Sequence, residues 1–380
     1  MRREDLERRR FLGTMAAASL SSLAARGARA EPQPAPPAAA SGPGGPPVRF
    51  AVVGINHAHI YGQTDAVLRG GGELVALYAE EPDLVAAFQK KYPQARLARS
   101  EAEVLDDPKI ALVLSSAIPD QRAPLGIRVM KAGKDYMSDK PGITSLAQLE
   151  EVRRVQAETK RIFSICYSER LENRATVKAG ELVKAGAIGK VVQTVGLGPH
   201  RMNVKSRPPW FFDYKRSGGI LTDIASHQAD QFLYFTGSTR ADVVASQVGN
   251  VHFKQYPAFQ DFGDMMLAGD GGSGYVRVDW FTPDGLSTWG DGRLTILGTD
   301  GYIEIRKNVD IAGREGGSHL FLVDHKETRY VDCQDVVLPY GAQLLDDVRN
   351  RTETAMPQAQ CFLAMELVLR AQQQARRLGA

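Results

Sequence analysis

The sequence has few cysteines and no long apolar segment. Three cysteines occur in 380 residues, and their wide spacing forms neither a C-x-x-C metal pattern nor a dense disulfide framework. We therefore expect three free thiols. No run reaches the roughly 18 apolar residues that a membrane-spanning helix needs, so we expect no stable membrane span. Apolar residues make up 43% and charged residues 24% of the chain. These proportions are typical of a soluble globular protein, and the length suits two domains.

The sequence also has little net charge outside its first 30 residues. Residues 1–30 hold seven arginines and three acidic residues, a net charge of +4. The whole chain carries +3, so residues 31–380 carry −1. An excess of positive charge is what attracts nucleic acids and anionic membranes. We therefore expect neither of them among the partners of the folded part.

The first 47 residues are not typical of a folded domain. Paired arginines before Phe11, a mildly apolar Ala/Leu/Ser stretch and a small-x-small site at 28–30 resemble a twin-arginine export signal over residues 1–30. An amphipathic first helix is the alternative. Residues 31–47 are rich in proline, alanine and glycine and predict a disordered linker. We expect the twin-arginine machinery as a partner and a periplasmic or otherwise exported location.

From residue 48 onward, short apolar segments alternate with helix-compatible segments of about ten residues or more. This alternation predicts βαβ units and a parallel sheet covered on both faces. Such a sheet binds ligands beyond the carboxyl ends of its strands. The expected strands are 48–54, 74–81, 111–119, 134–141 and 161–167.

The second half of the chain shows a different pattern. Helix-like segments at 172–186 and within 220–235 precede period-two stretches with glycine turns, and 357–377 is strongly helical. A period of two predicts a large antiparallel or mixed sheet. The fold class is therefore α/β, with a parallel-sheet domain at 48–166 and a second α/β domain at 167–380.

The first chemical motif, AVVGINHAHIYG, begins in the strand at 48–54. A strand, a glycine and a helix start place backbone N–H groups against a pyrophosphate. Gly54 occupies the first glycine position of G-x-G-x-x-G, whereas Asn56 and His59 occupy the other two. Asparagine tolerates positive φ and can still make the turn. His57 and His59 also suggest a metal site, but the spacing places no third ligand, so we expect a helix cap or a phosphate contact and no metal.

Two further motifs place reactive side chains. In GKDYMSDKPGIT, Lys140 ends a parallel strand and is held by the following proline, so it points into the crevice. In GGILTDIASHQADQF, Asp223 and His227 are four residues apart and share one face of a helix. A carboxylate beside an imidazole can select its tautomer and stabilise its charged form. The alternatives are a solvated lysine and a surface ion pair.

Together these motifs resemble the Gfo/Idh/MocA family of oxidoreductases. The family pattern combines a near G-x-G-x-x-G turn, an acid-Lys-Pro strand end, a Tyr-x-x-Arg and the helix motif G-G-x-x-x-D-x-x-x-H-x-x-D. The segments AGELVKAGAIGKV (179–191) and GTDGYIEI (298–305) are also similar, and the resemblance covers residues 48–377. It implies a Rossmann domain at 48–166 and a second domain whose open sheet commonly mediates oligomerisation. We therefore expect a homo-oligomer.

The resemblance also implies an enzyme with a nicotinamide cofactor, NAD or NADP, and a carbohydrate substrate. Catalytic positions are implied for Lys140, Asp223 and His227. Cofactor contacts are implied for Gly54, Ile55, Asn56, His57, Glu80, Ala117, Pro119, Asp139 and Lys140, where Asp139 replaces the usual glutamate. Substrate contacts are expected for Tyr167 and Arg170, which match Tyr-x-x-Arg, and for His200 and Trp210, which lie in aromatic-rich segments.

The expected cofactor and the expected export limit the reactions that this enzyme would catalyse. Ala79 takes the place of the family aspartate and Glu80 follows it; an acid here holds the ribose hydroxyls of NAD and repels the phosphate of NADP. NAD is therefore slightly favoured. Outside the cytoplasm there is no obvious free nicotinamide pool, so a tightly bound cofactor in a closed redox cycle is expected beside net dehydrogenation. Transient oxidation, as in NAD-dependent glycosidases or epimerases, and a sugar-binding protein without cofactor are the alternatives.

Overall fold

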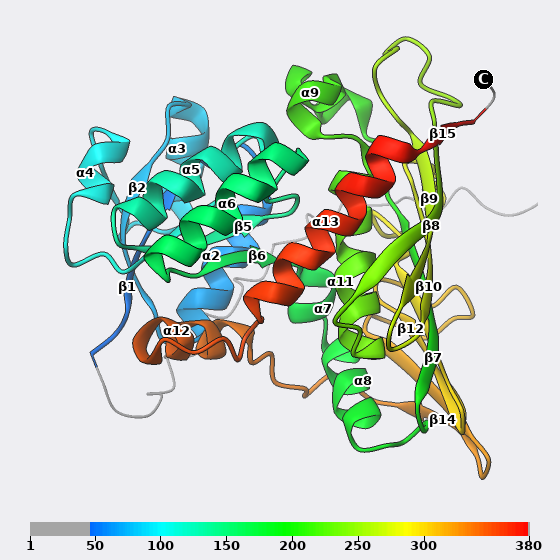
Figure 1. The fold of residues 1–380 in the computed structure, drawn as a ribbon. Coiled ribbons are helices and arrows are strands. Elements are labelled where there is room, and N and C mark those ends of the chain that lie inside the picture. Colours follow the sequence, from blue (N-terminus) through cyan, green and yellow to red (C-terminus); the bar gives the residue numbers. More distant parts are fainter. Residues whose placement is uncertain (1–45, 379–380) are drawn as a thin grey trace, which may run out of the picture. The chain divides into compact units, whose positions relative to one another are not determined.

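The computed structural model describes residues 46–378 of the chain. The expected export signal and nearly all of the expected linker lie outside the described residues. Two sheets, one parallel and one largely antiparallel, organise the described part, and helices lie between them (Figure 1). Within residues 46–378, no helix is long and apolar enough to cross a membrane.

The first sheet is parallel and has the strand order β3-β2-β1-β4-β5-β6. All residues of β4, β5 and β6 are buried, because helices cover both faces. The order reverses between β1 and β4, which opens a crevice beyond their carboxyl ends. The predicted Rossmann architecture is confirmed. The strands are β1 (Arg49–Val53), β2 (Glu73–Tyr78), β3 (Arg96–Leu97), β4 (Leu112–Ser115), β5 (Asp135–Asp139) and β6 (Phe163–Cys166).

The helices of this domain begin where local chemistry permits. The Ser145 hydroxyl accepts the Gln148 N–H at 3.2 Å and caps α6. Helix α5 begins at Pro119, because proline at a first helical position lacks only an N–H that would have no partner. The helices are α2 (His59–Arg69), α3 (Pro82–Lys91), α4 (Glu101–Leu105), α5 (Pro119–Lys131) and α6 (Leu146–Thr159).

The second sheet has nine strands in the order β14-β13-β12-β11-β7-β10-β9-β8-β15. Most neighbours are antiparallel, but β7 pairs with β10 and β8 with β15 in parallel, so the predicted mixed sheet is confirmed. The strands are β7 (Val191–Pro199), β8 (Ala241–Gly249), β9 (Phe262–Gly269), β10 (Ser273–Asp279), β11 (Arg293–Gly298), β12 (Gly301–Arg306), β13 (His319–Asp324), β14 (Thr328–Val331) and β15 (Arg376–Arg377).

Helices cover one face of the second sheet, and its other face is partly exposed. Helix α11 packs on β7 and β10, and α8 packs on β12 and β13. On the opposite face, Met266, Leu297 and Tyr302 are 39 to 50% exposed. The helices that follow the first domain are α7 (Ser168–Leu171), α8 (Arg174–Lys184), α9 (Tyr214–Ser217), α10 (Ile220–Asp223) and α11 (Ala225–Thr236).

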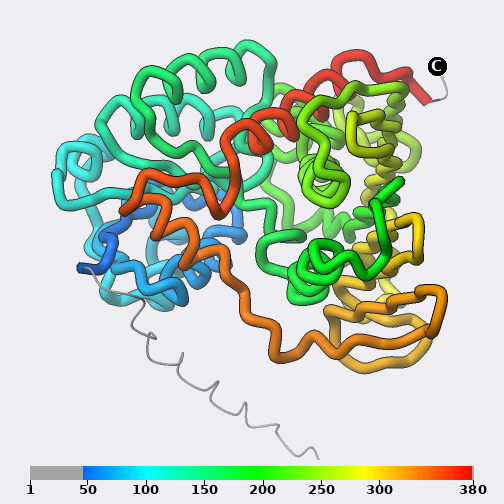
Figure 2. The backbone as a smooth tube through the Cα atoms, turned by 60° about the horizontal axis from the view of Figure 1, so that its bottom comes forward, coloured from blue at the N-terminus to red at the C-terminus, as the bar shows by residue number. Residues whose placement is uncertain are grey.

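The C-terminal segment joins the two domains. After β14 it returns to the Rossmann domain as α12 (Tyr340–Asn350), which packs on α2, and then crosses back as α13 (Gln358–Gln374) against α6, α11 and β8 (Figure 2). The Tyr340 hydroxyl lies 2.9 Å from the Ser164 hydroxyl, and Gln358 hydrogen-bonds both backbone polar groups of Phe163. The expected domain boundary after residue 166 therefore separates two sequence patterns, whereas the packed core continues across it.

Candidate active site

The first cavity lies at the carboxyl ends of β1, β2 and β4 and measures about 350 Å³. Four residues of the expected cofactor set line it: Gly54, Asn56, Glu80 and Ala117. Gly54 has φ +75°, and a Cβ there would lie 2.7 Å from the Cβ of Ala117. Only glycine combines that backbone angle with so close an approach. The side chain of Ile55 is buried in the core and does not line this cavity.

The residues around this cavity fit a dinucleotide. Helix α2 begins at His59 directly after the turn, so its first N–H groups and dipole favour a pyrophosphate. The acids Glu80 and Glu81 follow β2, where ribose hydroxyls are held in this fold. The Asn56 amide donates to Glu81 at 2.5 Å, so the residue in the second glycine position also holds the end of β2.

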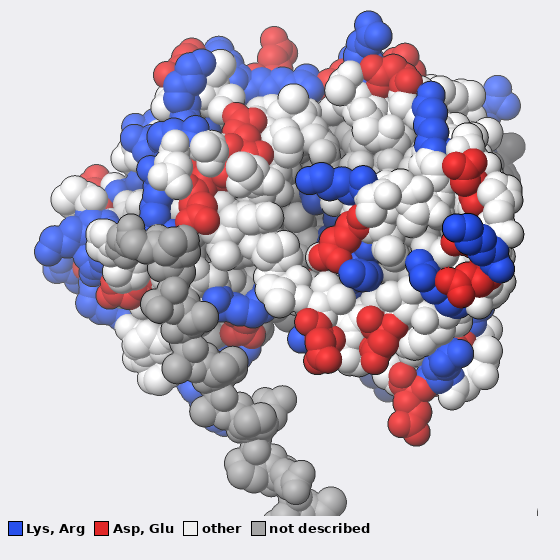
Figure 3. Space-filling view, turned by 90° about the horizontal axis from the view of Figure 1, so that it is seen from below, with Lys and Arg blue, Asp and Glu red and all other residues white. Residues whose placement is uncertain are grey.

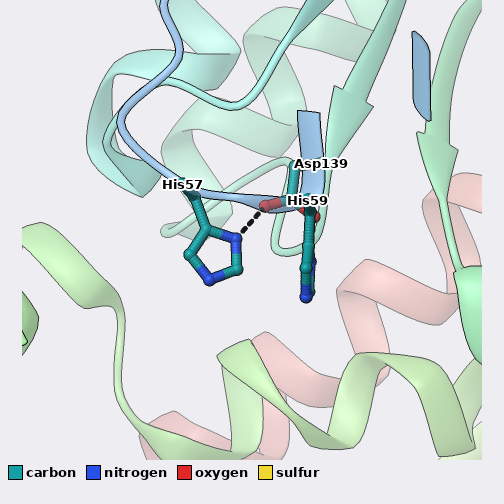
Figure 4. A group of neighbouring side chains, drawn as sticks. All are labelled: His57, His59 and Asp139. Atoms are coloured by element: carbon teal, nitrogen blue, oxygen red, sulfur yellow. Dashed lines mark hydrogen bonds and ion pairs between the residues drawn. The ribbon is translucent and has the colours of Figure 1, made fainter. Parts of the chain in front are cut away.

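A cluster of His57, His59 and Asp139 joins the glycine turn to the end of β5. The two Nδ1 atoms lie 2.9 Å from different oxygens of the Asp139 carboxylate. Figure 4 shows the two rings side by side, with Nδ1 of His57 toward Asp139 and its other ring nitrogen directed away. The sequence spacing offered no third metal ligand beside the histidines, and the fold supplies one in Asp139.

The surroundings of Asp139 favour a hydrogen-bonded network over a metal site. Its carboxylate also accepts from Arg122 Nη2 at 2.9 Å and from the Lys140 N–H at 2.8 Å. Burial alone would raise the pKa of Asp139, but Arg122 and the histidines hold it well below its usual range. Burial, followed by the neighbouring His59, lowers the pKa of His57 to about 4. A neutral His57 therefore donates from Nδ1 to the carboxylate and keeps Nε2 as an acceptor.

The second cavity measures about 280 Å³ and contains an ion pair between the two domains. Lys140 Nζ lies 2.9 Å from Asp223 Oδ1, and the lysine is 5% exposed. Lys140 directly follows β5, and Asp223 ends α10 after a turn in which Gly218 and Gly219 both have positive φ. Burial tends to raise the pKa of Asp223, but the adjacent Lys140 lowers it overall. His57 and Pro119 of the expected cofactor set also line this cavity.

His227 lies outside the second cavity. The helix is interrupted at Ile224, and Asp223 pairs with Lys140 instead of with His227. His227 is 2% exposed, its Nδ1 has no hydrogen-bond partner among the described residues, and burial lowers its pKa to about 3. The Asp223–His227 pairing expected from the four-residue spacing is therefore replaced by an interdomain ion pair.

Aromatic residues form one wall of the second cavity. His200 and Trp210, both expected near the substrate, line it together with Trp280 and Trp289. The His200 ring meets the two tryptophans edge-on, and its Nδ1 lies 3.0 Å from the Gly198 carbonyl oxygen. Burial and Lys140 lower the pKa of His200 to about 4. Trp280 and Trp289 were not predicted, because they are distant in sequence and only the pairing of β7 with its neighbours brings them together.

Tyr167 and Arg170 have structural contacts instead of the expected substrate contacts. Arg170 forms a two-pronged ion pair with Asp230, at 2.6 and 2.9 Å, and Asp230 is fully buried. Tyr167 is also fully buried, and its hydroxyl donates to the Cys361 carbonyl at 3.5 Å. Neither residue lines the two cavities. The Tyr-x-x-Arg motif thus ties α7 to α11 and α13.

Arg122 is another site residue that the sequence analysis missed. It is 1% exposed and donates to the carbonyls of Ala117, Lys140 and Pro141 as well as to Asp139. It thereby connects the loops after β4 and β5, on which both cavities depend. An arginine in the first turn of a helix looks solvated in sequence, so no local signal identifies it.

Comparison with known proteins agrees with this geometry. Residues 48–167 match the family described as "Oxidoreductase family, NAD-binding Rossmann fold", and residues 176–304 match the "GFO/IDH/MocA C-terminal domain". The chain belongs to the Gfo/Idh/MocA family. It is 25% identical over 314 residues to scyllo-inositol 2-dehydrogenase (NAD(+)) of Bacillus subtilis, covering 80% of this chain and 86% of that protein. This family membership makes the protein an oxidoreductase with an NAD-binding Rossmann domain.

Two further family relatives extend the comparison. Myo-inositol 2-dehydrogenase of Thermotoga maritima is 27% identical over 205 residues, which are 52% of this chain and 58% of that protein. A crystal structure from Erwinia carotovora atroseptica, described as an oxidoreductase, is 46% identical with a TM-score of 0.85. The match covers 87% of this chain and 100% of the Erwinia chain.

Proposed function

We propose that this oxidoreductase acts on a hydroxyl group of a sugar, polyol or glycoside bound in the second cavity. The observation that carries the proposal is the Lys140–Asp223 ion pair, 2.9 Å long, at the carboxyl end of a Rossmann strand. The tryptophans of the opposite wall offer flat apolar faces to a sugar ring. Inositol dehydrogenases among the relatives support a polyhydroxylated substrate.

The side chains of the cavity divide the work on the hydroxyl. Lys140 donates a hydrogen bond to the hydroxyl oxygen, and the ion pair with Asp223 holds this donor in position. His200 and His57 are neutral, and the Nδ1–H of each ring donates to an oxygen acceptor. Nε2 of either ring can therefore take the hydroxyl proton. The hydride that leaves the hydroxyl-bearing carbon is taken up by a nicotinamide when one is bound. His227 stays a predicted catalytic residue, although it is buried and does not line the second cavity.

The choice of cofactor follows from the end of β2. Glu80 lines the first cavity, one residue after the position where an acid holds a ribose diol and repels a 2′-phosphate. We therefore favour NAD over NADP. Two of the three fingerprint glycines are replaced. The dinucleotide still fits the Gly54 turn, the start of α2 and the acids after β2.

Export and oligomerisation remain part of the proposal. The sequence at 1–30 predicts export to the periplasm by the twin-arginine machinery, which would favour a firmly held cofactor and a closed redox cycle over net dehydrogenation. The partly exposed face with Met266, Leu297 and Tyr302 supports a homo-oligomer formed through the second sheet.

The decisive experiment identifies the cofactor and then the reaction. Denaturing the purified protein and analysing the supernatant by mass spectrometry should release NAD in near-equal amount to protein. A screen of sugars, inositols and glycosides for oxidation, hydrolysis and epimerisation should follow with Asp223→Asn as the inactive reference. Absence of nicotinamide after purification, together with no binding on titration, would leave a sugar-binding protein without cofactor as the function.

A further inference from the structure

The second cavity carries more positive than negative charge. Four lining side chains are cationic, Arg122, Lys140, Arg201 and Arg207, whereas Asp223 is the acid that lines it. Two of these cations are neutralised, Arg122 by Asp139 at 2.9 Å and Lys140 by Asp223 at 2.9 Å. The remaining cations are the two arginines on the loop after β7. Figure 3 shows acidic and basic side chains interspersed over one face of the molecule.

Arg207 is half-buried and forms no ion pair with a carboxylate within 4.0 Å among the described residues. Burial lowers the pKa of Arg207, and the charge of Asp223 opposes this only in part. Its guanidinium lies 4.5 Å from the Phe211 ring centre and 4.9 Å from that of Trp280. It donates to the carbonyls of Met202 and Arg201, which fixes its orientation but neutralises no charge. A desolvated guanidinium held in this way has donors left for a ligand.

Arg201 is the second cation. Two of its hydrogen bonds go to the carbonyls of Pro283 and Leu286, and its Nε is buried without a hydrogen-bond partner among residues 46–378. Its nearest carboxylate, Asp284, is 3.6 Å away and fully exposed, so solvent screens the pair. Asp139 and Asp223 neutralise two of the four cations, and Asp284 offsets Arg201 only in part, so the cavity keeps an excess of between one and two positive charges.

The other groups facing this excess do not balance it. His57 and His200 are neutral near pH 7, because burial lowers both pKa values to about 4. The carboxylate of Asp223 is already paired with Lys140. A cavity with uncompensated positive charge binds an anion better than a neutral molecule of the same shape.

We infer that the substrate is a sugar acid, an aldonate or uronate whose carboxylate binds Arg207 and Arg201 while its reacting hydroxyl faces Lys140 and Asp223. This inference rests on the proposed function and specifies its substrate class. The planar guanidinium suits a carboxylate, which it can bind through two parallel hydrogen bonds.

The first test compares acids with their neutral counterparts on the unaltered, cofactor-loaded protein. Dissociation constants are measured by calorimetry for D-glucuronate against D-glucose, D-galacturonate against D-galactose and D-gluconate against D-glucitol. A charge-assisted hydrogen bond contributes enough for the acid to bind about 10- to 100-fold more tightly. Equal or tighter binding of the neutral member, no binding of any acid, or tighter binding of D-glucose 6-phosphate than of D-glucuronate would overturn the inference.

The second test assigns the preference to Arg207. Arg207→Gln should reduce the affinity for the acid about 10-fold and leave that for the neutral counterpart unchanged, whereas Arg207→Lys should keep part of the preference. Lys215→Gln is the matched control, because Lys215 is an exposed cation on nearby α9 that lines neither cavity. Because Arg207 also holds its loop, Arg201→Gln is measured alongside. An unchanged acid preference in both arginine variants would refute the assignment.

Cofactor binding is followed separately by quenching of tryptophan fluorescence with NADH. Failure of NADH to bind would contradict the proposed function, while the acid preference could still be measured in the cofactor-free cavity. Retained NADH binding with no acid preference would contradict only the substrate class.

Discussion

The two cavities at the carboxyl edge of the parallel sheet differ in charge although they adjoin the same loops. The first is bordered by Glu80, Glu81 and Asp120, and its one arginine, Arg128, is bound by Glu101. The second contains cations in excess. The first must therefore hold a pyrophosphate through backbone N–H groups and the start of α2, whereas the second uses side-chain charge.

A single turn separates the two environments. Asn56 lines the first cavity and His57, the next residue, lines the second. Asp139 and Arg122 lie behind this turn and hold it to the ends of β4 and β5. Asn56 and His57 thus mark the boundary between the dinucleotide and the substrate, and the predictions below test that division.

The largest expected effect is at Lys140. Replacing it with methionine in Lys140→Met should lower turnover at least about 1000-fold, because the hydroxyl loses a charged donor that also orients Asp223. NADH binding should persist, since the first cavity does not contain Lys140. Steady-state kinetics and NADH titration measure both effects, with exposed Lys131→Met as the control. Normal turnover in Lys140→Met would remove the second cavity from the chemistry.

The next effect concerns the first cavity alone. In Gly54→Ala, the added Cβ meets Ala117 at 2.7 Å at a φ of +75°, which costs about 1 to 3 kcal/mol. NADH affinity should fall about 10- to 100-fold or the fold should lose that stability. Gly62→Ala is the control, since it lies inside α2 with no atom within 4 Å and should be neutral or slightly stabilising. Equal behaviour of the two variants would argue against a close-fitting turn.

A smaller change in the first cavity should alter the cofactor ratio. Glu80→Ser removes the acid expected to repel a 2′-phosphate, so the ratio of NADP to NAD affinity should rise about 10-fold. Titration of the two reduced cofactors measures it. The control is Glu73→Gln, which removes an exposed acid at the start of the same strand. If the ratio stays constant, Glu81 or the backbone must select the cofactor.

The smallest effect is a pH dependence of stability from His227. Its folded pKa of about 3 lies below the ordinary 6.5, so the unfolded chain binds the extra proton. The contribution of His227 to the free energy of unfolding is therefore fully present above pH 6.5 and is lost as the pH falls toward 3. At pH 5.5 the loss is about 1 kcal/mol. Thermal unfolding of wild type and His227→Gln at pH 7.5 and 5.5 should show a smaller decrease in Tm for the variant. An equal decrease in both proteins would indicate that His227 is protonated in the folded state.

Much of the fold was predictable because it depends on local patterns. Continuous apolar segments alternating with helices predicted the parallel sheet, and the period of two predicted the mixed sheet. The sequence motifs also placed Lys140, Asp223, His200 and Trp210 in one site, and the structure brings these four into one cavity. Motif matching was less reliable for Tyr167 and Arg170, because a motif records which residues recur and does not distinguish substrate contacts from packing contacts.

By itself, the amino-acid sequence determined the elements, the glycine turn and the lysine at the end of β5, since each follows from neighbouring residues. The tertiary structure alone decided which charges are neutralised. Asp223 pairs with Lys140, 83 residues away, instead of His227, four residues away, and Asp139 joins Arg122 to two histidines. Coulombic and hydrogen-bond partners depend on distance in space, which sequence spacing does not specify across domains.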